Sequence, residues 1–356
     1  MRVGLVCPYS LTHPGGVQGQ VLGLGRALRA LGHEARVLAP CDGPPPDAGV
    51  TPLGNSVPLA ANGSVAPLAP DPACALRTMR ALRDEGFDVV HLHEPMCPGP
   101  TLTTLMYHDG PMVGTFHRAG RSAAYVLLKP AVAVLARRLD RRCAVSHDAA
   151  RTAAKVMGGD YEVLFNGIEV ERYAMATPWP TEGPTILFLG RHEPRKGLDV
   201  LLEAMGRLPE DVTLWVAGQG PQTAELRARA EGDDRIEWLG RIDDETAAAR
   251  LRGADVLCAP SLHGESFGVV LLEGMAAQAA IVASDLEGYR NVSVPDQHAL
   301  LVPPGDVEAL ADTLARVLTD KDLRNSLVAA ADARVTEFSM ERLAERYLTV
   351  YGDARD

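Results

Sequence analysis

The chain has 356 residues, more than one hydrophobic core usually holds, so two domains of ordinary size are expected. Hydrophobic residues (46%) and charged residues (23%) occur in the proportions of a soluble globular protein with apolar material for two cores. The formal net charge of −11 argues against a general nucleic-acid binder, because a phosphate backbone requires a basic surface.

The sequence predicts no membrane-spanning helix, because no run of about 18 apolar residues occurs. The apolar start before Cys7 and Pro8 is too short for a signal peptide. The six cysteines lack C-x-x-C spacing, which favours reduced thiols over disulfides or a zinc site. We therefore expect a cytoplasmic protein.

The first half of the chain alternates strands and helices. Residues 2–6 predict a strand, 8–16 a loop rich in turn formers, 17–32 a helix that stops at Gly32, and 34–40 a second strand. Further short strands are expected at 88–93, 112–117 and 141–146. This alternation implies a parallel, doubly wound sheet, which binds ligands at the carboxyl ends of its strands.

Prolines and glycines interrupt this pattern at residues 166–184, and the alternation then starts again. The second half is expected to contain strands at 185–190, 212–218, 236–240, 255–261 and 280–286 and a helix at 198–208. The sequence therefore predicts an α/β protein built from two Rossmann-like domains.

The domain boundaries follow from this interruption. We expect one domain at 1–168, a linker at 169–183 and a second domain at 184–337. The last helix, 338–356, carries Leu343, Tyr347 and Tyr351 on one face and is expected to pack on the first domain.

Two loops combine features that suit an anion. Gly15 and Gly16 precede the first helix, where their amides can approach an anion closely, although a tight turn explains them equally well. In GRHEPRKG, Arg191, Arg195 and Lys196 share one loop ahead of a helix and suit a diphosphate. A solvated surface cluster is the alternative reading of these three cations.

A third loop, SLHGESFG, is expected to lead into a helix near Ser266 or Phe267. Glu265 lies at its mouth, and Glu273 follows in an otherwise apolar run, where a carboxylate is costly unless it is bonded. Because ionised carboxylates only accept hydrogen bonds, a ligand beside them requires hydroxyl groups. A nucleotide sugar offers both a diphosphate and hydroxyls.

The ordered motifs VCPYS…PGGVQ, HLHEP, TFH, FNGIEV, EPRKG, RIDD and GESFGVVLLEGMAA resemble the retaining GT-B glycosyltransferases of family 4. Within that family the chain is most similar to the actinobacterial phosphatidylinositol mannosyltransferases, over nearly its whole length. The resemblance implies a GT-B fold, with two Rossmann-like domains facing an interdomain cleft. It also implies a donor bound mainly by the second domain, no metal or other cofactor, and retention of anomeric configuration.

Site residues carry over motif by motif. The resemblance implies catalytic roles for His117, Arg191, Lys196 and Glu265. It implies a donor site of Gly15, Gly16, Arg191, Arg195, Lys196, Ile242, Glu265, Ser266, Phe267, Gly268, Val269 and Glu273. It implies an acceptor site of Tyr9, Gln18, Asn62, Ser64, Arg118 and Arg121.

Within these sets the implied roles differ. Arg191 and Lys196 would hold the donor diphosphate, Glu265 the transferred sugar and Glu273 the ribose. The reaction would resemble a front-face displacement, in which the leaving diphosphate oxygen helps to deprotonate the attacking hydroxyl. His117 would lie near the reacting carbon, while a satisfied histidine at a strand end is the alternative. His91 and His93 are read as structural or supporting.

A basic, amphipathic segment at 118–142 contains seven cations and one acid, Asp140. It suits the surface of an anionic membrane, and an ordinary helix packed on the sheet is the equal alternative from the residues alone. The resemblance favours a role of this segment in binding lipid. The expected partners are GDP-mannose as donor, phosphatidylinositol as acceptor and the inner face of the cell membrane, without nucleic acid and with no protein partner evident.

Three other functions stay open. A soluble family 4 transferase could use a UDP-sugar and a small acceptor such as an inositol phosphate. A nicotinamide-dependent oxidoreductase is suggested by Gly218-x-Gly220, but Thr223 and Glu237 fit that motif poorly. A sugar-nucleotide epimerase would share the diphosphate site and need no acceptor.

Overall fold

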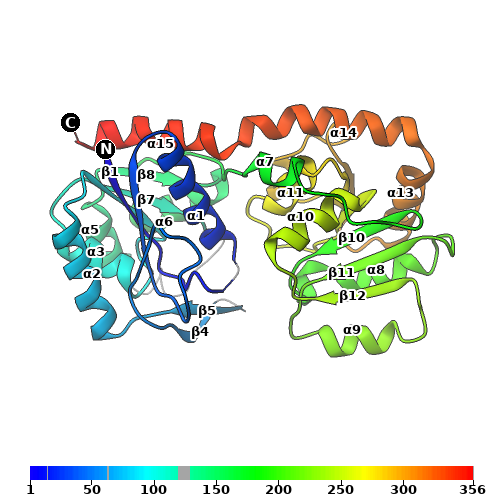
Figure 1. Cartoon of the computed structure of the whole chain (residues 1–356), viewed down its shortest axis with the longest axis horizontal. Coiled ribbons are helices and arrows are strands. Elements are labelled where there is room, and N and C mark those ends of the chain that lie inside the picture. Colours follow the sequence, from blue (N-terminus) through cyan, green and yellow to red (C-terminus); the bar gives the residue numbers. More distant parts are fainter. Residues whose placement is uncertain (14, 62–63, 119–128, 356) are drawn as a thin grey trace. The chain divides into compact units, whose positions relative to one another are not determined.

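The computed structural model describes residues 1–13, 15–61, 64–118 and 129–355, which form two compact units. The first unit comprises Met1–Gly167 and Met340–Asp356, and the second comprises Ile168–Ser339. Each unit is an α/β domain with its own parallel sheet (Figure 1). The expected α/β architecture is confirmed.

The first unit is built on a seven-stranded sheet in the order β3-β2-β1-β6-β7-β8-β9, in which every pair is parallel. Its strands are β1 (Arg2–Val6), β2 (Glu34–Ala39), β3 (Val50–Pro52), β6 (Val89–His93), β7 (Met112–Phe116), β8 (Arg141–Ala144) and β9 (Glu162–Val163). A separate antiparallel hairpin joins β4 (Val57–Ala61) to β5 (Ser64–Leu68). The strand order reverses between β1 and β6, which is where doubly wound sheets bind ligands.

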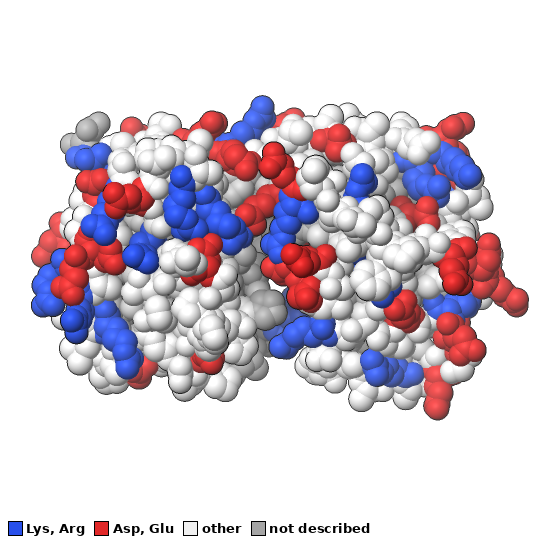
Figure 2. All heavy atoms as spheres, viewed as in Figure 1, with Lys and Arg blue, Asp and Glu red and all other residues white. Residues whose placement is uncertain are grey.

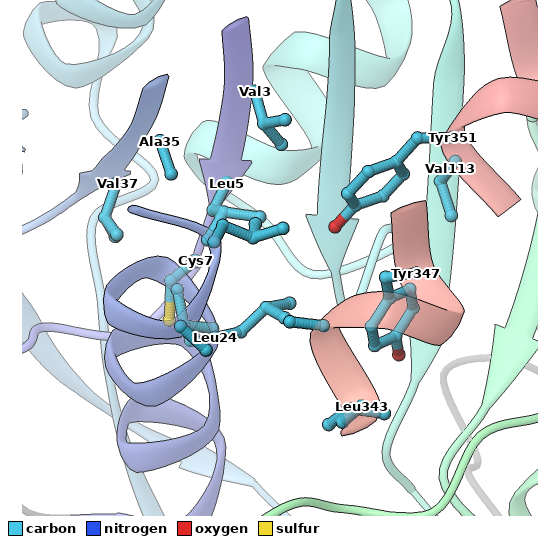
Figure 3. Close-up of a cluster of buried hydrophobic side chains, with 14 of the residues drawn as sticks. Val3, Leu5, Cys7, Leu24, Ala35, Val37, Val113, Leu343, Tyr347 and Tyr351 are labelled. Atoms are coloured by element: carbon cyan, nitrogen blue, oxygen red, sulfur yellow. The ribbon is translucent and has the colours of Figure 1, made fainter. Parts of the chain in front are cut away.

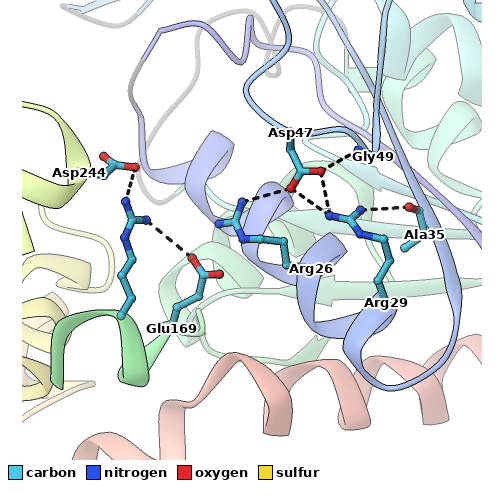
Figure 4. Close-up of polar contacts among 8 residues, drawn as sticks. Arg26, Arg29, Ala35, Asp47, Gly49, Glu169 and Asp244 are labelled. Atoms are coloured by element: carbon cyan, nitrogen blue, oxygen red, sulfur yellow. Dashed lines mark hydrogen bonds and ion pairs between the residues drawn. The ribbon is translucent and has the colours of Figure 1, made fainter. Parts of the chain in front are cut away.

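Helices cover both faces of this sheet. The described helices of the unit are α1 (Gly16–Ala30), α2 (Pro72–Glu85), α3 (Pro100–Tyr107), α5 (Lys129–Ala136), α6 (His147–Met157) and α15 (Met340–Arg355). One core lies between the sheet and the pair α1 and α15, and another lies under α2, α3, α5 and α6. Ion pairs on the surface add to this packing, as where Arg29 binds both carboxylate oxygens of Asp47 (Figure 4).

The C-terminal helix α15 packs in the first unit, as Figure 3 shows. Leu343, Tyr347 and Tyr351 point into the cluster formed by β1, β2 and α1. Tyr351 is fully buried and Tyr347 is 2% exposed, so the apolar face read from the sequence is a core face. Burying such rings stabilises a unit by roughly 1.5–3 kcal/mol each.

The second unit has a six-stranded parallel sheet in the order β12-β11-β10-β13-β14-β15. Its strands are β10 (Thr185–Leu189), β11 (Thr213–Ala217), β12 (Ile236–Gly240), β13 (Val256–Ala259), β14 (Ala280–Ser284) and β15 (Leu300–Val302). Its helices are α7 (Val170–Ala174), α8 (Leu198–Met205), α9 (Thr223–Arg229), α10 (Asp244–Gly253), α11 (Val269–Ala276), α12 (Glu287–Arg290), α13 (Val307–Thr319) and α14 (Lys321–Val335), with 3-10 turns η1 (Pro194–Lys196) and η2 (Thr336–Phe338).

Residues 169–183, which the sequence suggests as a linker, lie within the second unit. Helix α7 packs against α10 and α11, and Arg172 of α7 binds Asp244 of α10 at 2.8 Å (Figure 4). Farther along, the backbone N–H of Trp179 donates to the carbonyl of Ala249. The segment is therefore anchored to the second unit at α7 and at the backbone of Trp179, while residues 177–182 between α7 and β10 are exposed.

Candidate active site

The cationic loop of the second unit follows strand β10 and is held close to strand β13. Gly197 ends the turn η1 at φ +65°, and a Cβ there would lie 2.0 Å from the carbonyl oxygen of Pro260. Only glycine permits this approach. The backbone N–H of Leu262 also donates to the carbonyl of Arg195 at 2.8 Å. The loop GRHEPRKG and the loop SLHGESFG are thereby fixed against each other.

Glu193 organises two of the three cations. Its carboxylate is nearly buried, and its two oxygens each lie 3.0 Å from an Nε atom, one of Arg191 and the other of Arg195. Bonds of this charge-assisted kind restrict both guanidinium groups. Glu193 was not among the predicted site residues, although its place between the two arginines was the available signal.

Glu265 receives three hydrogen bonds on a single oxygen. Its Oε1 lies 2.7 Å from Lys196 Nζ, 3.2 Å from an Arg195 guanidinium nitrogen and 3.0 Å from Ser261 Oγ. Burial alone would raise the pKa of Glu265, but the adjacent cations and these bonds outweigh burial and lower that pKa. Glu265 is therefore an ionised acceptor whose Oε2 accepts none of these three bonds.

Glu273 lies in the second turn of α11, where burial raises its pKa to about 7. The hydroxyl of Tyr173 donates to Glu273 Oε1 at 3.2 Å, which opposes the rise, and the negative charge of Asp244 adds to it. The hydroxyl of Tyr173 is therefore the hydrogen-bond partner that the carboxylate of Glu273 requires within this apolar run. Sequence reasoning missed Tyr173 because it lies in the segment read as a linker.

The start of α11 differs from the expectation. The helix begins at Val269, two to three residues later than expected, because Gly268 takes the left-handed conformation at φ +92°. Phe267 is 1% exposed and packs on Phe338, so its side chain belongs to the core. Only its backbone can therefore serve a ligand. Ser266, Val269 and Ile242 remain partly exposed.

In the first unit, polar side chains gather where strands β6 and β7 end. His93 Nδ1 and His117 Nε2 lie 2.9 Å apart, and the backbone N–H of His117 donates to Glu94 Oε1 at 2.6 Å. Glu94 is buried and holds a positive φ of 53°, a conformation that L-residues rarely adopt. The motif HLHEP, which spans the end of β6, was a signal for this cluster, but Glu94 was not among the predicted site residues.

Tyr9 and Gln18 lie around the end of β1 and the start of α1. The hydroxyl of Tyr9 lies 3.6 Å from Cys97 Sγ, and burial raises the pKa of both groups. Gln18 folds over Gly15, which takes extended backbone ahead of α1, and its amide donates weakly to the carbonyl of Ser10 at 3.4 Å. Gly16 is the first residue of α1 and is exposed.

The structure describes only some of the remaining residues expected to bind the acceptor. Asn62 and Arg121 lie outside the described residues, and only the backbone of Ser64, the first residue of β5, is described. Arg118 is half-buried, and its charge acts against the rise in the pKa of Cys97. Of the expected acceptor residues, the side chains of Tyr9, Gln18 and Arg118 can be placed, and all three belong to the first unit, as does the expected catalytic residue His117.

The described part of the basic segment is buried along one side and exposed elsewhere. In α5, Val132 and Ala136 enter the core, and Arg142 donates to the carbonyl of Ala136 at 2.8 Å. Arg138 binds the carbonyl of His108. Over residues 129–142 the chain therefore packs Val132 and Ala136 into the core and leaves Lys129, Arg137 and Arg141 exposed, which fits both readings of this segment.

The surface carries both signs of charge. On the face in Figure 2, Lys and Arg side chains are interspersed with Asp and Glu over each unit. None of the helices described is long and apolar enough to cross a membrane. Among the residues placed in the structure, no group of three or more His, Cys, Asp or Glu side chains could hold a metal ion.

The features that suggested a nicotinamide cofactor have structural roles. The backbone N–H of Gly220 donates to Thr223 Oγ1 at 2.9 Å, so this turn is bonded within itself. Glu237 lies within β12 and binds the guanidinium group of Arg250 with both carboxylate oxygens. The carboxylate of Glu237 therefore pairs with Arg250 of the same unit and is not placed to bind a ribose.

Known proteins match both halves of the chain. The family described as Glycosyltransferase Family 4 matches residues 14–172, and that described as Glycosyl transferases group 1 matches residues 170–334. The phosphatidyl-myo-inositol mannosyltransferase of Mycobacterium leprae is 41% identical over 99% of this chain and 96% of its own length. The Mycolicibacterium smegmatis protein of the same name is 40% identical over 99% of this chain and 93% of its own.

A more distant relative and two solved structures of low sequence identity also match the chain. The D-inositol 3-phosphate glycosyltransferase of Xylanimonas cellulosilytica is 31% identical over 96% of this chain and 92% of its own. Among solved structures, HepE of Anabaena with UDP-glucose has a TM-score of 0.78 at 18% identity, covering 99% of both chains. Sucrose-phosphate synthase of Thermosynechococcus elongatus has a TM-score of 0.76 at 20% identity, covering 99% of this chain and 98% of its own. The chain therefore belongs to glycosyltransferase family 4, with the GT-B fold, in the group that includes the actinobacterial phosphatidyl-myo-inositol mannosyltransferases.

Proposed function

We propose that this enzyme transfers mannose from GDP-mannose to the inositol ring of phosphatidylinositol, with retention of anomeric configuration. The observation that carries the proposal is the 40–41% identity along almost the whole chain to proteins named for that activity. The inositol phosphate glycosyltransferase is more distant, at 31% identity. The hydrogen-bonded cluster around Glu265 supports the donor side of the proposal.

The donor diphosphate is assigned to Arg191 and Lys196, with Arg195 beside them. The bonds to Glu193 and Glu265 hold these cations in one loop before any ligand arrives. Preorganised charge of this kind stabilises a departing diphosphate without reorganisation during the reaction. Because these cations supply the positive charge that a divalent ion would otherwise bring, we propose a reaction that requires no metal.

The sugar hydroxyls are assigned to the two glutamates. Glu265 is ionised and keeps Oε2 for a hydroxyl of the transferred mannose. Glu273 is assigned to the ribose hydroxyls, with Tyr173 holding one of its carboxylate oxygens. On the acceptor side, Tyr9, Gln18 and Arg118 are assigned to the lipid headgroup.

The acceptor lipid places the reaction at the inner face of the cell membrane, where we propose that the protein binds peripherally. In the basic segment, Lys129, Arg137 and Arg141 are exposed. Exposed cations attract anionic headgroups by about 1 kcal/mol each near the surface. We therefore expect Arg137→Glu combined with Arg141→Glu to weaken sedimentation with phosphatidylglycerol vesicles, with neutral vesicles as the control.

The test is transfer from radiolabelled GDP-mannose to phosphatidylinositol in detergent micelles, with and without EDTA. We expect a labelled glycolipid in both conditions. Lys196→Ala should slow turnover on the order of a hundredfold, because one preorganised contact to developing charge is worth about 2.7–4 kcal/mol. Lys321→Ala, at an exposed lysine of the same unit, should leave turnover unchanged. Product formed only from UDP-glucose and inositol 3-phosphate would overturn the proposal.

A further inference from the structure

His93 and His117 form a histidine pair at the carboxyl edge of the first unit's sheet. Strands β6 and β7 are parallel neighbours, with His93 in register with Thr115, so both imidazoles reach the same edge. Nδ1 of His93 lies 2.9 Å from Nε2 of His117, and the ring centroids are 5.2 Å apart. His93 is 2% exposed, whereas His117 keeps some exposed surface.

Both rings of this pair are neutral at physiological pH. Burial lowers the pKa of His93 well below its usual value and lowers the pKa of His117 to about 3. In a neutral imidazole one nitrogen donates and the other accepts. A single proton therefore lies between the two facing nitrogens, and its position sets the tautomer of both rings.

The far nitrogen of His93 decides where that proton lies. Nε2 of His93 is buried and has no hydrogen-bond partner among the residues placed in the structure. A proton there would be an orphaned buried N–H, which folded proteins rarely contain, whereas an unpartnered lone pair is better tolerated. The proton of His93 therefore belongs on Nδ1, which donates to Nε2 of His117.

The neighbours keep both rings in place. His91 lies 4.2 Å from His93 between ring centroids, and its own nitrogens are bonded to Tyr351 and Thr115 at 2.8 and 2.7 Å. The backbone of His117 is held by the carboxylate of Glu94. Turning either imidazole to exchange its nitrogens would break the 2.9 Å bond between the two rings.

We propose that His93 is a positioning residue that holds His117 with its proton on Nδ1, so that His117 presents an N–H donor to a hydroxyl oxygen of the substrate. This inference rests on the proposed function, in which His117 lies near the reacting carbon. His117 then stabilises an oxygen and does not take the proton of the attacking hydroxyl. That proton is left to the diphosphate oxygen of the departing donor.

The test replaces His93 by side chains that differ in what they can do at the position of Nδ1. His93→Asn keeps an N–H donor there, whereas the carboxylate of His93→Asp only accepts. Long-range ¹H–¹⁵N spectra of the full chain, with His117 assigned by its loss in His117→Asn, report which nitrogen carries the proton. We expect a proton on Nδ1 of His117 in the wild type and in His93→Asn, and on Nε2 in His93→Asp.

Turnover should follow the tautomer. His93→Asn should retain kcat within a few-fold, and His93→Asp should lose about a hundredfold in kcat with an unchanged KM for the donor. A wild-type spectrum with the proton on Nε2 of His117 would overturn the inference, as would equal kcat in the two variants. The wild-type spectrum tests the position of the proton on His117 even if a variant does not fold. Lack of mannosyl transfer by the wild type would instead contradict the proposed function and leave the tautomer result standing.

Discussion

Replacing Tyr173 by phenylalanine tests the donor side of the site most directly. The hydroxyl of Tyr173 donates to Glu273 Oε1 at 3.2 Å, and the pKa of Glu273 is already raised to about 7. A hydrogen bond to an ionised group is worth about 1.5–3 kcal/mol, and this length favours the lower end. Removing it should raise the pKa of Glu273 further, by about one pKa unit.

The consequence for donor binding follows from the ionised fraction of Glu273. At pH 7 about half of the wild-type carboxyl groups are ionised, and in Tyr173→Phe about one tenth would be. Because the ionised form accepts the ribose hydroxyls, GDP-mannose should bind about fivefold more weakly to the variant at pH 7. At pH 9 both proteins are ionised at this position, so their affinities should agree.

Calorimetric titration with GDP-mannose between pH 6 and pH 9 measures this. The wild-type affinity should rise with pH through about 7, and the midpoint should lie higher in the variant. Tyr107→Phe, which removes a hydroxyl from an exposed ring, is the control and should match the wild type. Equal affinities at pH 7, or a loss that persists unchanged at pH 9, would refute the link between Tyr173 and the charge of Glu273.

Two further predictions concern stability. The folded-state pKa of Glu273 exceeds its ordinary value of 4.5, so its ionisation costs stability as pH rises from 4.5 to about 7. Glu273→Gln should therefore raise the free energy of unfolding at pH 8, by at most about 3 kcal/mol, and much less at pH 4, as measured by urea unfolding at both values. Tyr351→Phe removes the 2.8 Å partner of buried His91 Nδ1 and should cost about 1–3 kcal/mol, seen as a lower Tm. An unchanged Tm would contradict the assignment of that bond.

The sequence predicts most of the fold because the spacing of apolar residues indicates where helices and strands lie and which of their faces are buried. The apolar face of α15 was read from Leu343, Tyr347 and Tyr351, and the structure places all three in a core. The start of α11 was placed two to three residues early, because the conformation of Gly268 depends on contacts that the sequence does not display. Residues 169–183 were read as a linker for a related reason, since the packing of α7, at 170–174, on α10 and α11 is non-local.

The candidate site likewise contains residues that the sequence predicts and residues that it does not. The cations of the loop GRHEPRKG and the two glutamates stand out in the sequence because their types and spacing indicate diphosphate and hydroxyl chemistry. The groups that orient them do not stand out. Tyr173 reaches Glu273 across 100 positions, and His93 reaches His117 across 24. Such pairs depend on which elements become neighbours, which composition and periodicity do not determine.

The two glutamates of the motif show how one residue type acquires two properties from its position. Glu265 lies in the loop ahead of α11, beside Lys196 and Arg195, and its pKa is lowered despite burial. Glu273 lies within the helix, where its bonded partner is the neutral hydroxyl of Tyr173 and the pKa is raised. The seven residues between them therefore join a carboxyl group whose pKa is lowered to one whose pKa is raised to about 7. Of the two, only Glu273 should make donor affinity depend on pH in the physiological range, because Glu265 stays ionised throughout it.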